Sequence, residues 1–158
     1  GVPDEYPLEA AGCRIDENGK KYIRVKGVRW YTNIDHGRRH NPLSLMSMAD
    51  NIKYSKHKDI QGKKYQHYDN YDAIEIPYTD AIPCDYENLM GVPVTFLDKY
   101  CPEQFDIIWQ ACGNTRASAP KEILDEVGYT IHPEDRGGCG VVNNKRQYAR
   151  ILIRKKHL

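Results

Sequence analysis

The sequence predicts an α+β fold made mostly of antiparallel strands, with one short helix. Short segments of alternating apolar and polar residues are separated by Gly, Pro and Asn, which is typical of strands joined by turns. Only residues 119–127 combine helical spacing with a start and a stop residue. The chain has 158 residues, which is enough to bury about two-thirds of its unfolded surface around a core.

The first predicted element is a β-hairpin formed by residues 11–16 and 21–25. Asn18-Gly19 lies between them, and this pair supplies the positive φ angles of a type I′ turn. Residues 28–32 are predicted to form a third strand.

The middle of the chain is predicted to be a long connection. Residues 41–72 show neither a helical nor a strand period, and connections of this length are uncommon unless they are functional. A short strand follows at residues 73–76 and is closed by Pro77.

The most apolar stretch of the chain predicts a central strand. Val92, Val94 and Phe96 occupy alternate positions, as β-branched and aromatic residues do on one face of a strand. Pro93 lacks an N–H donor and is therefore expected at the start of this strand or on a sheet edge. Another strand begins at residues 106–109.

The predicted helix, residues 119–127, has Ser118 as its N-cap, Pro120 in its first turn and Gly128 after its end. A closing hairpin follows, in which residues 141–142 pair with residues 147–154. Its alternation places Arg150 on the polar face.

The composition excludes several classes of protein. The net charge is +1, so an argument for nucleic-acid binding has to be local. No apolar run approaches the ~20 residues of a membrane span. The five cysteines are widely spaced and form no Cys-x-x-Cys pair, which favours reduced thiols in a cytoplasmic protein over disulfides or a zinc site.

We identify no catalytic or metal-binding residue in the sequence. His36 and His40 are four residues apart, but Gly37 argues against the helix that would bring them to one face. Asn41-Pro42-Leu43 lacks the second proline and the aromatic residue of an amino-methyltransferase loop, and is interpreted as a turn. The glycine-rich residues 137–140 precede a strand, whereas a cofactor loop would open a helix.

Four ordered segments resemble the EcoRI-type adenine-specific DNA methyltransferases. They are residues 27–36 (GVRWYTNIDH), 68–74 (YDNYDAI), 90–108 (MGVPVTFLDKYCPEQFDII) and 148–154 (YARILIR). The resemblance implies methyl transfer from S-adenosylmethionine to the exocyclic amine of adenine in a specific sequence of double-stranded DNA.

The resemblance also implies that this chain corresponds to the C-terminal region of such an enzyme. The catalytic Asn-Pro-Pro-aromatic loop and most of the cofactor site would belong to a missing N-terminal catalytic half, so this chain alone is expected to be inactive. Residues 1–35 would complete the end of a Rossmann-like methyltransferase sheet, and residues 36–158 would form a target-recognition region.

Within that region, Lys and Arg are expected to contact phosphates, and Arg and Asn to contact base edges. The candidate DNA-binding residues form three clusters: Arg38, Arg39 and His40; Asn114, Arg116 and Arg136; and Lys145, Arg146 and Arg150. Two alternatives remain open: a non-catalytic DNA-binding module, and a structural domain whose tyrosine-rich loops bind other proteins.

Overall fold

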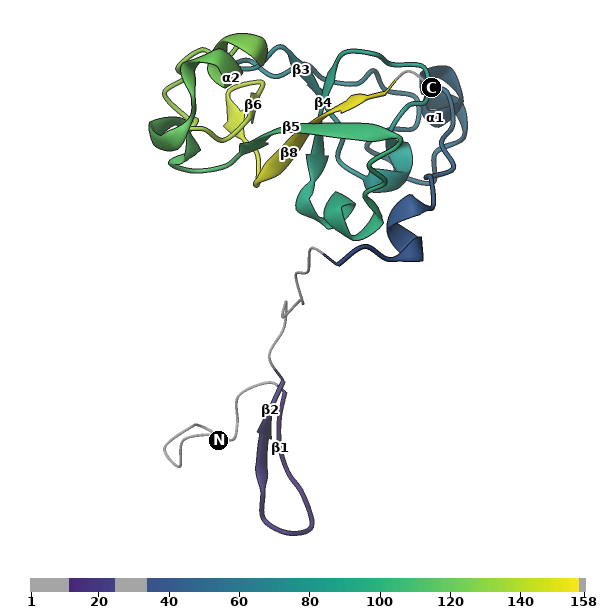
Figure 1. Cartoon of the computed structure of the whole chain (residues 1–158), viewed down its shortest axis with the longest axis vertical. Coiled ribbons are helices and arrows are strands. Elements are labelled where there is room, and N and C mark those ends of the chain that lie inside the picture. Colours follow the sequence, from purple (N-terminus) through teal and green to yellow (C-terminus); the bar gives the residue numbers. More distant parts are fainter. Residues whose placement is uncertain (1–11, 25–33, 157–158) are drawn as a thin grey trace. The chain divides into compact units, whose positions relative to one another are not determined.

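The computed structural model describes residues 12–24 and 34–156 (Figure 1). The chain divides into two compact units, Gly1–Ile34 and Asp35–Leu158. The described residues form short strands in mixed and antiparallel sheets together with a few short helices, which confirms the α+β prediction. None of the helices in these described ranges is long and apolar enough to cross a membrane.

The described part of the first unit is an antiparallel hairpin of β1 (Cys13–Ile15) and β2 (Lys21–Ile23), as predicted. The third strand that was expected over residues 28–32 lies outside the described residues.

The turn of this hairpin differs from the type I′ prediction. Gly19 has a positive φ of 75°, whereas Asn18 does not adopt one. The reason is the side chain of Asp16, whose carboxylate accepts hydrogen bonds from the backbone N–H groups of Asn18 (3.0 Å) and Lys20 (2.9 Å). The N–H of Asp16 also donates to the carbonyl of Lys20 (3.0 Å), so residues 17–19 form a three-residue loop in place of the two-residue loop of a type I′ turn.

The second unit is built on a four-stranded mixed sheet with the order β3-β4-β8-β5 (Figure 1). Its strands are β3 (Ala73–Glu75), β4 (Leu89–Pro93), β5 (Phe105–Ala111) and β8 (Arg150–Lys155). β3 and β4 are parallel, and β8 runs antiparallel to both of its neighbours.

Both faces of this sheet are buried. On the central strand β8, Ile151 and Ile153 belong to one hydrophobic cluster and Leu152 to another. The polar face predicted for this strand is therefore buried at Arg150 and Leu152, although the Arg154 side chain is 39% exposed. A strand covered on two sides is apolar at almost every position.

The stretch after β4 is not a strand, contrary to the prediction for residues 92–97. Pro93 ends β4, and η3 (Val94–Lys99) follows as a 3₁₀ helix. Phe96 is buried while Val94 is exposed, although a strand would place both side chains on one face. The helical turn lets Phe96 enter the core alone.

The connection over residues 41–72 contains a helix that the sequence did not predict. It is α1 (Met48–Tyr54), which begins after Ser47. The Ser47 hydroxyl accepts a hydrogen bond from the backbone N–H of Asp50 at 3.0 Å, as an N-cap does. Two 3₁₀ helices, η1 (Gly37–His40) and η2 (Thr79–Ala81), flank this part of the chain.

The one predicted helix is present as α2 (Lys121–Glu126), preceded by η4 (Thr115–Ser118). Gly128 follows it with a φ of 59°, as predicted for a helix stop. The N-cap is Pro120 rather than Ser118, because the Ser118 hydroxyl instead donates to the carbonyl of Thr115.

The predicted pairing of residues 141–142 with residues 147–154 is wrong. The last hairpin consists of β6 (Val141–Val142) and β7 (Lys145–Arg146), and the chain then leaves it to enter the main sheet as β8. Asn143 (φ 50°) and Asn144 (φ 59°) both have the positive φ angles of a type I′ turn.

Candidate nucleic-acid interface

Asn70 connects the segment before β3 to the start of the β6–β7 hairpin through hydrogen bonds. It is fully buried, and its amide donates to the carbonyl of Cys139 (2.9 Å) and accepts from the N–H of Val141 (2.9 Å). Its own carbonyl accepts from the N–H of Thr130 at 3.0 Å. Asn70 thus connects its own segment to residues 130 and 139–141, and both its side-chain amide groups have partners, as buried polar groups require.

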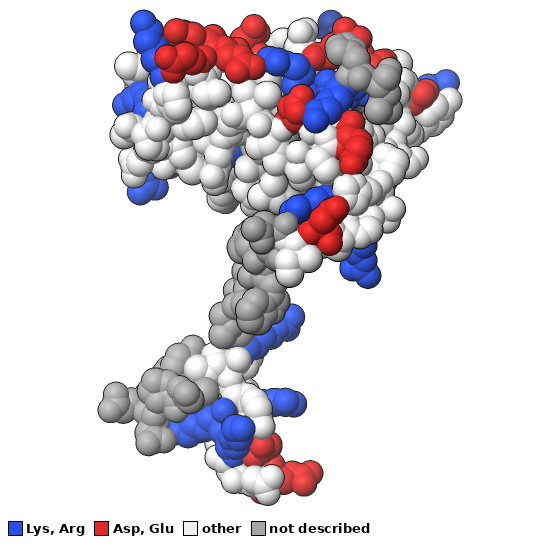
Figure 2. Space-filling view, viewed as in Figure 1, with Lys and Arg blue, Asp and Glu red and all other residues white. Residues whose placement is uncertain are grey.

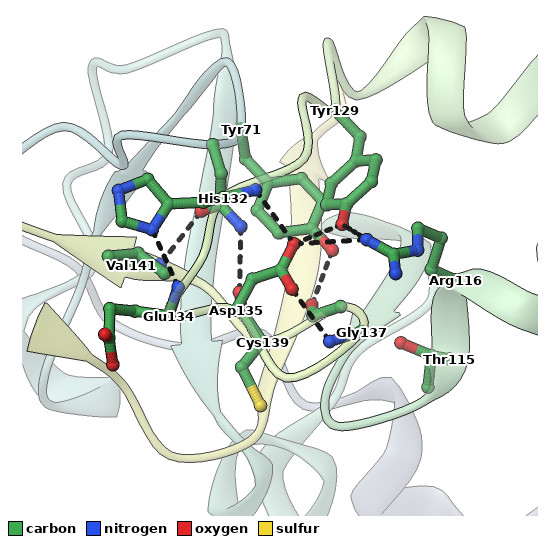
Figure 3. A network of polar contacts seen from close by, with 12 residues as sticks. Tyr71, Thr115, Arg116, Tyr129, His132, Glu134, Asp135, Gly137, Cys139 and Val141 are labelled. Atoms are coloured by element: carbon green, nitrogen blue, oxygen red, sulfur yellow. Dashed lines mark hydrogen bonds and ion pairs between the residues drawn. The ribbon is translucent and has the colours of Figure 1, made fainter. Parts of the chain in front are cut away.

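Asp135 fixes the glycine-rich loop that leads into this hairpin (Figure 3). Its side chain accepts hydrogen bonds from the N–H groups of Gly137 (2.8 Å) and His132 (3.2 Å) and from the hydroxyl of Tyr129. Burial would raise the pKa of Asp135, but these bonds and the charge of Arg116 lower it below its ordinary value. The carboxylate is therefore charged and holds the loop in one conformation.

Tyr71 also binds the glycine-rich loop. Its hydroxyl donates to the carbonyl of Gly138 at 2.6 Å, and burial raises the pKa of Tyr71, so the hydroxyl keeps its proton. Gly138 has a φ of 143°, and a β-carbon there would lie 2.7 Å from the carbonyl oxygen of Cys112. Only glycine allows the two loops to approach this closely.

Hydrogen bonds between two loops bring together the residues of the second predicted cluster. The N–H of Asn114 donates to the carbonyl of Arg136 (3.1 Å), and the N–H of Arg116 donates to the carbonyl of Gly137 (2.9 Å). Asn114 and Arg136 are exposed. The loops that carry these residues therefore run side by side, although they are about twenty residues apart in sequence.

Part of the third cluster lies next to the second. Arg146 pairs with Val141 in the β6–β7 hairpin, and the N–H of Gln147 donates to the carbonyl of Gly140 (2.8 Å), so Arg146 lies beside the segment that directly follows the loop of Arg136. The side chains of Arg136 and Arg146 are exposed and have no ion-pair partner among the residues that the structure describes. We call Asn114, Arg116, Arg136, Lys145 and Arg146 the hairpin surface.

Arg116 is only partly available on this surface. Its guanidinium donates to the hydroxyl of Tyr129 at 2.9 Å and lies 3.6 Å from the carboxylate of Asp135. Its side chain is nevertheless 36 % exposed, so part of it remains accessible to solvent.

Arg150 is separated from the hairpin surface by burial. Its guanidinium binds Glu75 through Nε (2.9 Å) and Nη2 (2.6 Å), and the Tyr68 hydroxyl donates to the same carboxylate. Its charge is therefore compensated inside the protein, and its role is structural.

The first cluster lies elsewhere in the second unit. In Figure 1 the blue turn of residues 37–40 is on the opposite side of this unit from β6. His40 is held between two carboxylates: Nε2 lies 2.6 Å from Asp35, and Nδ1 lies 2.5 Å from Glu103. These two contacts raise the pKa of His40. The pKa of Glu103 is lowered to about 2, mainly by a hydrogen bond from the Cys101 thiol and to a smaller extent by the one from His40.

Arg38 of the first cluster lines a cavity of about 410 Å³. Lys99 also lines it, together with the carboxylates of Asp80 and Asp98, so the two signs of charge balance. This cavity does not have the unbalanced positive charge that a phosphate site needs.

Basic residues do not form a continuous face in the view of Figure 2. Blue and red side chains alternate around a mostly uncharged middle, and red side chains gather over α2, which contains Glu122, Asp125 and Glu126. Among the described residues, no group of three or more His, Cys, Asp or Glu could hold a metal ion.

The sequence did not indicate the residues that position the hairpin surface. Asn70, Tyr71, Tyr129 and Asp135 show no periodicity, and their partners lie on distant segments. The one indication was that Asn70 and Tyr71 lie in a segment that resembles a known family.

Curated relatives match almost the whole chain. The type II methyltransferase M.EcoRI of Escherichia coli is 38% identical over 157 residues, which are 99% of this chain and 39% of that protein. M.MgeORF184P of Mycoplasma genitalium is 33% identical over 90% of this chain and 40% of its own length. M.MpnI of Mycoplasma pneumoniae is 27% identical over similar shares, 90% and 40%.

The chain thus spans about two-fifths of the length of these relatives. No solved structure matches it. The family model described as adenine-specific methyltransferase EcoRI matches residues 1–156. Because this match covers nearly every residue and agrees with the relatives, the chain belongs to the EcoRI family of adenine-specific methyltransferases.

Proposed function

We propose that this chain is the DNA-contacting, C-terminal part of an adenine-specific DNA methyltransferase. The whole enzyme transfers a methyl group from S-adenosylmethionine to the exocyclic amine of adenine in a specific duplex sequence. The hairpin surface contacts the DNA, and the buried sheet of the second unit supports that surface.

The observation that carries this proposal is the set of unpaired cations at one anchored place. Arg136 and Arg146 are exposed and unpaired within the described ranges, and Arg116 and Asn114 lie on the adjoining loop. Arginine binds phosphates and guanine edges, and asparagine binds adenine edges. Because Asn70 and Asp135 fix the loops, the protein does not have to order them when DNA binds.

We infer that catalysis needs residues that this chain does not supply. The nearest sequence to a catalytic loop, Asn41-Pro42-Leu43, is used for packing: the N–H of Leu43 donates to the Gln104 amide oxygen (2.7 Å), and its carbonyl accepts from the Gln104 amide (2.9 Å). The Leu43 carbonyl, the acceptor of this pair, is therefore already used by Gln104 and is not the free acceptor that an adenine amine requires.

We assign no S-adenosylmethionine contact to this chain. The cavity of about 410 Å³ beside residues 41–45 has no glycine-rich loop in its lining, and its charges balance. The cofactor would be held by the rest of the enzyme.

DNA binding by the 158-residue chain tests this proposal. Fluorescence anisotropy with a labelled random-sequence duplex, at about 50 and 200 mM salt, should show binding that weakens steeply with salt, because cations displace counterions from phosphates. Tritiated methyl transfer by the same chain should be absent. Binding that is missing at low salt would overturn the DNA-contact role, and methyl transfer would show that the catalytic loop lies within the chain.

A further inference from the structure

A second cavity lies between residues 59–66 and the β6–β7 hairpin. Its volume is about 250 Å³. Cavities that hold drug-sized ligands begin at roughly 300 Å³. The space therefore fits a single planar ring system better than a whole cofactor, and it is larger than a phosphate group requires.

Between its charged floor and its charged rim, this cavity is lined by apolar side chains and two side-chain amides. Ile60, Pro77 and Val142 line it, with Gln66 and Gln147 among the polar lining residues. The Gln147 side chain uses its NH₂ group on the carbonyl of Lys145 (2.9 Å), and no bond of the described residues occupies its oxygen. Apolar walls with a few polar groups suit a nucleobase, which has flat apolar faces and a hydrogen-bonding edge.

The two charged residues at the floor of the cavity neutralise each other. Glu75 and Arg150 line it and pair with each other at 2.6 Å, and the Tyr68 hydroxyl donates to Glu75. A charged ligand is therefore not needed to compensate the floor.

The rim, in contrast, carries an excess of positive charge. Lys63 and Lys64 line the cavity and are exposed, and their ammonium groups have no partner among the described residues. Asp59 is the remaining acidic group of the lining, and its carboxylate accepts a hydrogen bond from Tyr78 at 3.0 Å. Two lysines against one carboxylate favour a phosphate at the rim.

This cavity adjoins the hairpin surface directly. The Asn143 amide at the tip of the hairpin donates to the Gln66 amide oxygen at 3.1 Å. Val142 and Gln147, on either side of Lys145 and Arg146, line the cavity. A nucleic-acid strand that follows Lys145 and Arg146 thus passes the mouth of the cavity.

We propose that this cavity binds one unstacked nucleotide, with its base between the apolar walls and its phosphate at Lys63 and Lys64. The proposal rests on the proposed DNA-contact function, since it adds a nucleotide subsite to the hairpin surface. The nucleotide comes from the bound strand or from free mononucleotide, and both sources present the same base and phosphate.

Nuclear magnetic resonance of the full ¹⁵N-labelled chain tests the base contact. The probes are deoxyadenosine 5′-monophosphate, deoxyadenosine, inorganic phosphate and a short single-stranded oligonucleotide. The nucleotide and the oligonucleotide should shift the side-chain amide signals of Gln66, Asn143 and Gln147, deoxyadenosine should shift them at higher concentration, and phosphate should leave them in place. Unmoved amide signals with every probe, or equal shifts with phosphate alone, would overturn the proposal.

Comparing the oligonucleotide with the mononucleotide separates the two sources. Saturation by the oligonucleotide at much lower concentration supports a subsite for a bound strand. Equal or tighter binding of the free mononucleotide supports the cavity as a nucleotide site and overturns its place along a strand.

A matched pair of variants tests the phosphate contact. Lys63→Ala/Lys64→Ala should lower the salt slope of duplex binding by about 0.7–0.9 for each phosphate that the two lysines neutralise. Lys53→Ala, on α1, removes an exposed cation that lines no part of this cavity and should leave the slope unchanged. An unchanged slope for the lysine pair, with duplex binding intact, would overturn the subsite and leave the DNA-contact role standing. Absence of duplex binding by the unsubstituted chain would instead remove the proposed function.

Discussion

The hairpin surface and the segment of residues 35–43 both contain several basic residues, but the groups that the nearby carboxylates bind differ between them. Around the hairpin, the neutral amide of Asn70 and the inward-facing carboxylate of Asp135 hold the backbone, and the exposed Arg136 and Arg146 have no carboxylate partner in the described ranges. In the other segment, two carboxylates hold His40 itself. Carboxylates thus bind a basic side chain directly in the second segment, whereas at the hairpin they and an amide bind the backbone beside Arg136 and Arg146.

The largest expected effect concerns the buried ion pair under the hairpin. Arg150→Met leaves Glu75 charged and buried without its partner, so the free energy of unfolding should fall by about 3–5 kcal/mol. Chemical denaturation measures this decrease. The double variant Glu75→Leu/Arg150→Met should recover most of it, because neither charge then remains buried. A decrease no larger than that of an exposed substitution would contradict the structural role of Arg150.

The next effect concerns the anchor of the hairpin surface. Asn70→Ala leaves the buried carbonyl of Cys139 and N–H of Val141 without partners, which should lower the free energy of unfolding by about 2–4 kcal/mol. Amide hydrogen exchange should accelerate most between residues 136 and 146. Gln61→Ala, at an exposed position, is the control for stability. Faster exchange spread evenly over the whole unit would argue against a local anchor.

A third test compares the two basic regions in DNA binding. Arg136→Ala/Arg146→Ala should reduce the salt slope of duplex binding by about 1.8 if each side chain contacts one phosphate. The free energy of unfolding of this double variant should change by no more than about 0.5 kcal/mol, because both side chains are exposed. Arg38→Ala/Arg39→Ala removes the same charge and should leave the slope nearly unchanged. If the second variant had the larger effect, the contact surface would have to be moved to residues 38–40.

The smallest expected effect is the pH dependence of the His40 contacts. The pKa of His40 is raised in the folded state, so its stabilisation is present below its ordinary value of 6.5 and is lost as the pH rises through the raised value. The pKa of Glu103 is lowered to about 2, so its contribution is present above 4.5 and is lost as the pH falls toward 2.

Denaturation of the unsubstituted chain and of His40→Gln at pH 5.5 and 8.5 measures this contribution. The stability difference between the two proteins should be larger at pH 5.5, and high salt should reduce it because the groups are exposed. Glu103→Gln should lower the pKa of His40 in a histidine titration by nuclear magnetic resonance. A stability difference that is the same at both pH values would show that His40 does not titrate in this contact.

Features that depend on a few neighbouring residues could be predicted from the sequence. The first hairpin, the strand at residue 73, the start of β5 near residue 106 and the stop of α2 at Gly128 all follow from local backbone preferences. The family resemblance was also visible in the sequence, because it is carried by ordered segments along the whole chain.

The availability of each charged residue, in contrast, depends on the folded arrangement of the chain. Arg150 is neutralised by Glu75, 75 residues away, and His40 by Glu103, 63 residues away. The helical turn after Pro93 also depended on the core, since alternation alone would place Val94 beside Phe96. Turn and helix-stop preferences act over a few residues, whereas burial and ion pairing are set by segments that meet only when the chain has folded.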